Sequence, residues 1–287
     1  MRHRKPSRRS AAVALLAAAL AFAAGCRRKA EPVASLSVEP KDVQLPAGQV
    51  AGWKLAWNPK TPLENVQGKP RVFVHVLSAR NLLRTFDHPL GEEWTPFKGQ
   101  SYEIDLYQSE LAEPLPAGAY EVTAGLYDDS SGERWALETA GDAVGKREYR
   151  VATLVVPAEK AETPAYDFAG GWLSPEPGGS KQVITRRCAA GEASITVRGV
   201  AAPGTLLLGS SVPKLASGAW GGAVAVTATC GAERQEINGP EVQWSRIPIA
   251  PSASDPACEI RFAPVPPAAG GNERSVCLEV LAWRPAG

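Results

Sequence analysis

From Ala34 onwards, short runs of alternating apolar and polar residues follow one another, and none keeps the period of an amphipathic helix. In one run, Trp53, Leu55 and Trp57 alternate with Lys54 and Ala56. Successive side chains of a strand point to opposite faces, so this run predicts a strand with one buried and one wet face. Proline and glycine, which form turns and interrupt helices, separate the runs. The chain is therefore predicted to be all-β.

Residues 34–156 hold about seven such runs, which is typical of an immunoglobulin-like β-sandwich. The run Arg71–Ala79 is apolar at both parities and predicts a central strand. Tyr120 follows the turn Pro116–Gly118 at the head of a strand, the position of a tyrosine corner. We expect the Tyr120 hydroxyl to bond a backbone group just upstream.

A polar segment with a proline near each end, residues 157–165, predicts a linker. Residues 166–287 repeat the all-β pattern, with predicted strands that include Lys181–Arg187 and Ala193–Val200. Connections rich in proline and glycine suit a jelly-roll-like β-sandwich. We therefore expect a second domain here, long enough to bury its own core.

The second half contains four cysteines: Cys188, Cys230, Cys258 and Cys277. In an exported protein these predict two disulfides, and the three connectivities they allow are not distinguished by sequence alone. We favour Cys230 with Cys258 and Cys188 with Cys277, because Cys230 closes one predicted strand and Cys258 opens another soon after. This half contains no closely spaced pair of cysteines, such as C-x₂-C, and no histidine, so we expect no metal site.

Residues 1–25 combine a basic start, an apolar run too short to span a bilayer and small residues before Cys26, which predicts an export signal. Ala23-Ala24-Gly25-Cys26 resembles the lipobox of bacterial lipoproteins. The resemblance implies cleavage before Cys26, acylation of that cysteine and a tether over residues 26–33. It also favours the outer over the inner membrane, because Arg27 stands where aspartate signals inner-membrane retention. The basic run Arg27–Lys29 either contacts anionic headgroups or forms a solvated spacer.

The net charge of the chain limits the classes of molecule that it is expected to bind. Residues 1–25 contain five of the 31 lysine and arginine residues and none of the 30 acidic ones, so the remaining chain carries a formal charge of −4. Nothing in this balance is the basic footprint of a nucleic-acid-binding protein. The expected partners are the membrane, through Cys26, and a glycan or an envelope protein.

Few residues suit catalysis. His75 alternates with core positions and is interpreted as a satisfied core histidine. Asp87 and His88 could orient a general base, but a turn in which Asp87 bonds backbone amides is favoured. The chain has no Gly-x-Ser-x-Gly motif. The run Asp128–Glu133 lacks the spacing of a calcium loop and is interpreted as a hairpin turn. We predict no catalytic residue, no metal and no cofactor.

Four aromatic residues form a speculative ligand-binding rim: Trp94, Tyr107, Tyr127 and Trp135. By parity they lie at strand ends or on the wet face, with carboxylates nearby. Aromatic rings stack on sugar faces, while carboxylates bond sugar hydroxyls. The alternative, which we favour, is that Trp94 and Trp135 cap the ends of a small core.

Several motifs of the first half occur in a fixed order: Phe73–Leu77, Asp87–Pro89, Trp94, Leu115–Tyr120, Gly125–Asp128 and Gly132–Trp135. This series, over residues 70–156, is similar to a β-sandwich module attached to some bacterial glycosyltransferases of the dolichyl-phosphate-mannose type and to some exported proteins. Through Gly171–Glu176 and Asn272–Leu281, the second half more faintly resembles a jelly-roll module of the same architectures. The resemblance implies a fold and a neighbourhood of envelope polysaccharide, with no activity attached.

Together these observations predict a lipid-anchored envelope protein with a non-enzymatic binding or scaffolding role. One alternative is an envelope glycoside hydrolase whose paired carboxylates include Glu176 and Asp167. Another is a structural partner of a membrane or secretion complex, with the second domain, whose charges balance to zero, as its interface.

Overall fold

The computed structural model describes residues 30–62, 68–90, 95–139, 141–214, 221–230, 234–251, 257–265 and 274–286. Cys26 and Trp94 lie outside these residues. The described residues form strands and turns without any helix, which confirms the all-β prediction. Accordingly, the described part of the chain has no helix long and apolar enough to cross a bilayer. The described residues from Pro32 onwards belong to one compact unit.

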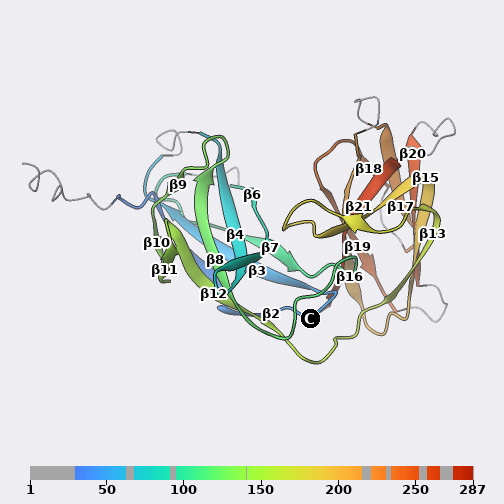
Figure 1. The fold of residues 1–287 in the computed structure, drawn as a ribbon, viewed down its shortest axis with the longest axis horizontal. Coiled ribbons are helices and arrows are strands. Elements are labelled where there is room, and N and C mark those ends of the chain that lie inside the picture. The colour runs from blue at the N-terminus through green and yellow to red at the C-terminus, as the bar shows by residue number, and fades with distance from the viewer. Residues whose placement is uncertain are drawn as a thin grey trace, which may run out of the picture. The chain divides into compact units, whose positions relative to one another are not determined.

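The first half of the chain supplies two sheets, coloured blue to green in Figure 1. The smaller has four strands in the spatial order β10-β1-β3-β7. Its strands are β1 (Ala34–Glu39), β3 (Val50–Pro59), β7 (Gln100–Tyr107) and β10 (Leu137–Thr139). Alternation determines the inner face of β3, because Trp53, Leu55 and Trp57 are buried while Lys54 is exposed.

The larger sheet of the first half has eight strands, five of them in the order β11-β12-β8-β4-β5. The strands are β2 (Asp42–Gln44), β4 (Pro70–Ser78), β5 (Asn81–Thr85), β6 (His88–Pro89), β8 (Gly118–Asp128), β9 (Arg134–Trp135), β11 (Ala143–Gly145) and β12 (Glu148–Val156). β4, predicted as central, lies between β8 and β5. Ala79 and Arg80 join β4 to β5 with positive φ angles of 46° and 69°, the pattern of a tight hairpin turn that follows the strand twist.

The two sheets of the first half bury one hydrophobic cluster, which we call the first core. Val72, Val74 and Val76 of β4 belong to it together with Trp53 and Leu55 of β3. At its edge, the Tyr120 hydroxyl donates to the Pro116 carbonyl at 2.6 Å, as predicted. This bond ties the start of β8 to the loop before it.

The second half forms a nine-stranded sheet, seven strands of which follow the order β18-β17-β20-β15-β21-β16-β19. The strands are β13 (Ala165–Trp172), β14 (Glu176–Pro177), β15 (Thr185–Arg198), β16 (Gly204–Ser211), β17 (Ala223–Ala228), β18 (Gln235–Ile237), β19 (Gln243–Ile249), β20 (Cys258–Val265) and β21 (Arg274–Pro285). The predicted linker contains no strand until Ala165, its last residue, where β13 begins.

β15 corrects the prediction of two separate strands in its region. It runs unbroken from Thr185 to Arg198. Gly191 takes a positive φ of 81°, and the register with β21 shifts between Ala189 and Ala190. Such a bulge bends a strand without ending it, so β15 pairs first with β21 and then with β20.

The disulfides have the pairing that the sequence analysis favoured. Cys188 of β15 stands directly opposite Cys277 of β21, and their Cα atoms are 3.9 Å apart. Cys230, just after β17, is bonded to Cys258 at the start of β20, with a Cα separation of 5.1 Å. Both disulfides therefore link neighbouring strands of the nine-stranded sheet covalently.

β21 contacts two hydrophobic clusters through its two faces. Val280 and Ala282 pack into the first core, while Leu281 and Trp283 pack into the core of the second half. Backbone hydrogen bonds support the contact: the Trp283 amide donates to Gly48 at 2.8 Å. The Glu110 amide donates to Leu281 at 2.7 Å. The first and second halves therefore share buried apolar surface.

Candidate functional site

A cleft of about 550 Å³ opens where β7 and β19 approach each other. Its lining comes from β6 and the two residues before it, Phe86 and Asp87, from β7, and from β19 with the turn that precedes it. Arg71 of β4 and Gln182 complete the lining. The volume lies within the range of about 300–1,000 Å³ that is common for small-molecule sites.

Aromatic rings form one wall of the cleft. The Tyr107 ring centroid lies 5.1 Å from that of Phe86 and 5.5 Å from that of Trp244. The sequence analysis placed Tyr107 at a strand end or on the wet face. Tyr107 is the last residue of β7, and it is buried because Trp244 of β19 packs against it. Burial raises the pKa of the Tyr107 hydroxyl. The wall is therefore rigid and largely apolar.

Ion pairs hold the charged side of the cleft in place. Arg246 Nη2 lies 2.7 Å from Asp105 Oδ2. Arg284 Nη2 lies 2.9 Å from Asp105 Oδ1 and 2.8 Å from Glu103 Oε1. One carboxylate thus forms ion pairs with two guanidinium groups, which positions β7 against β19 and β21.

Asp87 reaches into the sheet rather than toward its neighbour His88. Asp87 Oδ1 accepts from the Val74 amide at 3.3 Å and lies 3.8 Å from His75 Nε2. Burial raises the pKa of the Asp87 carboxyl, although His75 and the Val74 amide act in the opposite direction. The backbone bond supports the interpretation of Asp87 as a structural acceptor.

His88 uses both ring nitrogens. Its Nδ1 donates to the Phe86 carbonyl at 3.0 Å, so its Nε2 accepts from the Tyr102 hydroxyl at 2.9 Å. Burial lowers the pKa of His88 and raises that of Tyr102 to about 12, in agreement with two neutral groups. His88 therefore presents a neutral ring to the cleft.

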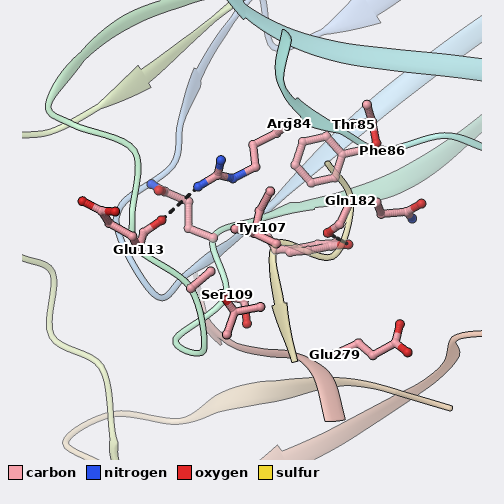
Figure 2. A pocket seen from close by; sticks show the side chains of 12 residues that line it. Arg84, Thr85, Phe86, Tyr107, Ser109, Glu113, Gln182 and Glu279 are labelled. Carbon is pink, nitrogen blue, oxygen red and sulfur yellow. Dashed lines mark hydrogen bonds between the residues drawn. The ribbon is translucent and has the colours of Figure 1, made fainter. Parts of the chain in front are cut away.

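Beside the aromatic wall lies a cavity of about 10 Å³, close to the smallest that holds one water molecule. Phe86, Tyr107 and Gln182 line both this cavity and the cleft. Figure 2 shows the Tyr107 side chain near the centre of the view, with Phe86 above it and Glu279 below it. Ser211 Oγ donates to Glu279 Oε1 at 2.5 Å, and burial raises the pKa of Glu279.

Two other aromatic residues named from the sequence, Tyr127 and Trp135, do not line the cleft. Tyr127 of β8 stands opposite Arg71 of β4, so it borders the cleft without lining it. Trp135 of β9 pairs with Leu126 and packs against the first core. Trp94 is outside the described residues.

A polar network covers the outer face of the eight-stranded sheet. His75 Nδ1 lies 3.3 Å from Glu148 Oε1, and Glu148 also accepts from Thr123 Oγ1 at 2.7 Å and from Arg134 Nη1 at 2.8 Å. The bond with His75, followed by those from Thr123 and Arg134, lowers the pKa of Glu148 to about 2. His75 is therefore satisfied by carboxylates on a sheet face, rather than among core residues as predicted.

The Asp128 loop has the geometry of a turn. The Asp128 carboxylate accepts from the Lys69 amide at 2.9 Å, the Ser130 amide at 3.1 Å and Ser131 Oγ at 2.6 Å. These bonds, with that from Ser131 the strongest, hold the pKa of Asp128 well below its usual value. Among the described residues, no group of three or more acidic, histidine or cysteine side chains is placed to hold a metal.

The carboxylates proposed for hydrolysis are engaged in ion pairs. Arg274 bonds both oxygens of Glu176, at 2.8 and 2.6 Å, and Arg186 Nε donates to Glu176 at 2.8 Å. Asp167 Oδ2 lies 2.7 Å from Arg198 Nε. Neither carboxylate lines the cleft.

The sequence analysis did not predict that Trp244 and Arg246 lie together in the cleft. In β19, Ser245, Ile247 and Ile249 are buried, and Trp244 and Arg246 occupy the opposite face. This alternation could have placed both on one face. That the face turns toward β7 depends on tertiary packing and has no sequence signal.

No protein-family model matches the chain, and comparison with curated proteins likewise finds no match.

Proposed function

We propose that this chain is a lipid-anchored protein of the bacterial cell envelope that binds a glycan in the cleft and catalyses no reaction. The observation that carries the proposal is the combination of Trp244 and Tyr107 with charged side chains in one cleft of about 550 Å³. A sugar ring presents an apolar face of C–H groups and an edge of hydroxyls. Aromatic rings suit the face, and carboxylates and guanidinium groups suit the edge.

The cleft is organised before any ligand arrives. Its aromatic wall is packed against Phe86, and Asp105 is bonded by two arginines. Side chains that are already ordered lose little entropy on binding, which favours affinity. Glu241 and Arg71 also line the cleft and would reach ligand hydroxyls.

The use of the polar groups favours binding over catalysis. A general acid or base must exchange a proton with its substrate, yet both ring nitrogens of His88 are bonded within the protein. Glu176 is braced by Arg186 and Arg274. Both arrangements suit structural roles.

We also propose the finer architecture: an immunoglobulin-like sandwich over residues 34–156 and a jelly-roll-like sandwich over residues 166–287. The Tyr120 bond to Pro116 supports the first assignment, because it has the form of a tyrosine corner. The similarity of residues 70–156 to the glycosyltransferase-attached module supports a place near envelope polysaccharide.

The membrane anchor is proposed at Cys26, after removal of residues 1–25, with the outer membrane as the destination. The two disulfides support export, because such bonds persist in oxidising compartments. Labelled palmitate should enter the wild-type protein and be absent from Cys26→Ser. Equal labelling of the two proteins would contradict the anchor.

The binding proposal is tested on an array of bacterial surface glycans. We expect Trp244→Ala to weaken binding by about tenfold or more, as truncation of a central aromatic contact does. Trp135→Ala is the matched control, because Trp135 packs against the first core and does not line the cleft. The melting temperature of each variant shows that it is folded. Unchanged binding by folded Trp244→Ala, or a wild-type protein that binds no glycan, would refute this function.

A further inference from the structure

We propose that the turn Thr95–Lys98 contacts the membrane surface, with the Phe97 ring inserted among the lipid headgroups. The proposal rests on the lipid anchor at Cys26 proposed above. It adds a second point of attachment, which would fix the face that the strands present to the bilayer.

The turn places a bulky residue where glycine is normally required. The Lys98 amide donates to the Thr95 carbonyl at 3.2 Å, which closes a four-residue turn with Pro96 in second place. Phe97, in third place, has a φ of 58°. A turn with proline second and a positive φ third normally has glycine at that third position, because a Cβ atom strains this backbone.

Packing of the Phe97 side chain against the protein does not offset this strain. It is 78% exposed. Single exposed apolar residues are ordinary on protein surfaces, but they are not ordinarily held in a strained conformation. The other exposed large hydrophobic residue of the described chain, Leu173, is 40% exposed and has no positive φ. Phe97 is therefore positioned to bury its ring against something outside the protein.

The position of the turn identifies that surface. The Phe97 amide donates to the Pro59 carbonyl at 2.9 Å, and the next residue, Lys60, donates its amide to the Val33 carbonyl at 2.8 Å. The turn thus lies at the end of the strands where the chain enters β1. Val33 is seven residues after Cys26, and seven extended residues span at most about 25 Å. An acylated Cys26 would hold this end close to the bilayer.

The charges nearby match an anionic lipid surface. Lys98 is exposed next to Phe97, and Arg27, Arg28 and Lys29 follow the anchor directly. Basic residues close to a bilayer are attracted to anionic headgroups, and aromatic rings partition into the interfacial layer. Lys60 is paired with Glu138 at 2.5 Å, so we assign the contact with anionic headgroups to Lys98 and to the basic residues of the tether.

The experiment measures the depth of the turn in vesicles of phosphatidylethanolamine and phosphatidylglycerol that carry a lipid-borne quencher. Full-length acylated Thr95→Cys protein is labelled with an environment-sensitive fluorophore, and Leu173→Cys serves as the matched control. The native cysteines are bridged or acylated, so the new thiol is labelled selectively. We expect several-fold stronger quenching at residue 95 than at residue 173.

The decisive variant is Phe97→Gly in the Thr95→Cys protein. Glycine suits the positive φ, so the melting temperature should not fall, while quenching at residue 95 should drop to the level of residue 173. Protein that floats with the vesicles while residue 95 stays unquenched, or quenching that survives Phe97→Gly, overturns the membrane contact alone. Protein that fails to float overturns the anchor, and the contact with it.

Discussion

The guanidinium group of Arg284 in β21 lies 2.9 Å from Asp105 Oδ1 in β7, across the contact between the first and second halves of the chain. Arg246 of β19 lies 2.7 Å from the other oxygen of the same carboxylate. Because the Asp105 side chain is 12% exposed, solvent screens these attractions only partly. Asp105 therefore joins β7, β19 and β21 at the cleft.

Asp105→Asn should lower the free energy of unfolding by about 1 to 3 kcal/mol, because both arginines lose the negative charge with which they pair and one acceptor oxygen becomes an NH2 donor in a partly buried place. The matched control is Glu103→Gln, which also removes a carboxylate bonded to Arg284. The Glu103 side chain is 56% exposed, so its loss should change stability by about 0.5 kcal/mol or less. Denaturant unfolding measures both. Equal losses would show that Asp105 has no special role.

Glu279→Gln should make the protein more stable at neutral and alkaline pH. Burial raises the folded-state pKa of Glu279 above its ordinary value of 4.5, so ionisation opposes folding. The wild-type protein therefore loses stability as the pH rises from about 4.5 through the folded-state pKa, and the variant does not. We expect similar melting temperatures at pH 4 and a higher one for the variant at pH 8, by about 2 to 4 °C for each kcal/mol gained. A variant that is less stable at pH 8 would contradict this account.

The fold was predictable where a pattern of local residues determines the structure. Alternation in Trp53–Trp57 gave a strand with a buried face, and the Pro-Gly turn before Tyr120 gave the position of its hydrogen bond. The favoured disulfide pairing also followed from the predicted strand order. β15 was divided wrongly, because a bulge at a glycine looks like a turn in the sequence.

The cleft was less predictable, because its two sides are far apart in the chain. Tyr107 was expected at a strand end or on the wet face, and the residue that packs against it, Trp244, lies more than a hundred positions later. Parity states which face a side chain occupies, but it does not state what packs on that face. The ion pair between Arg246 and Asp105 was not predictable for the same reason: its two residues are far apart in the chain.

Tyr120→Phe should lower the free energy of unfolding by about 0.5 to 1.5 kcal/mol, the usual contribution of one hydrogen bond. Tyr166→Phe is the matched control, because the Tyr166 hydroxyl is buried without a hydrogen-bond partner among the described residues. Removing an unpaired buried hydroxyl should leave stability unchanged or raise it. Denaturant midpoints of the two variants should therefore move apart. A Tyr120→Phe protein as stable as wild type would mean that the bond to Pro116 adds nothing.

Glu148→Gln should show the opposite pH dependence to Glu279→Gln. Hydrogen bonds from His75, then from Thr123 and Arg134, lower the folded-state pKa of Glu148 to about 2 from an ordinary value of 4.5. The ionised carboxylate thus stabilises the fold above about pH 4.5, and this contribution is lost as the pH falls toward 2. The Glu148 side chain is 15% exposed and the glutamine is nearly isosteric, so the variant removes charge with little change in packing. Denaturant unfolding between pH 7 and pH 2.5 should show wild type more stable at neutral pH by about 1 to 3 kcal/mol, with the difference shrinking in acid. A difference that stays constant over this range would show that the charge of Glu148 does not stabilise the outer face of the eight-stranded sheet.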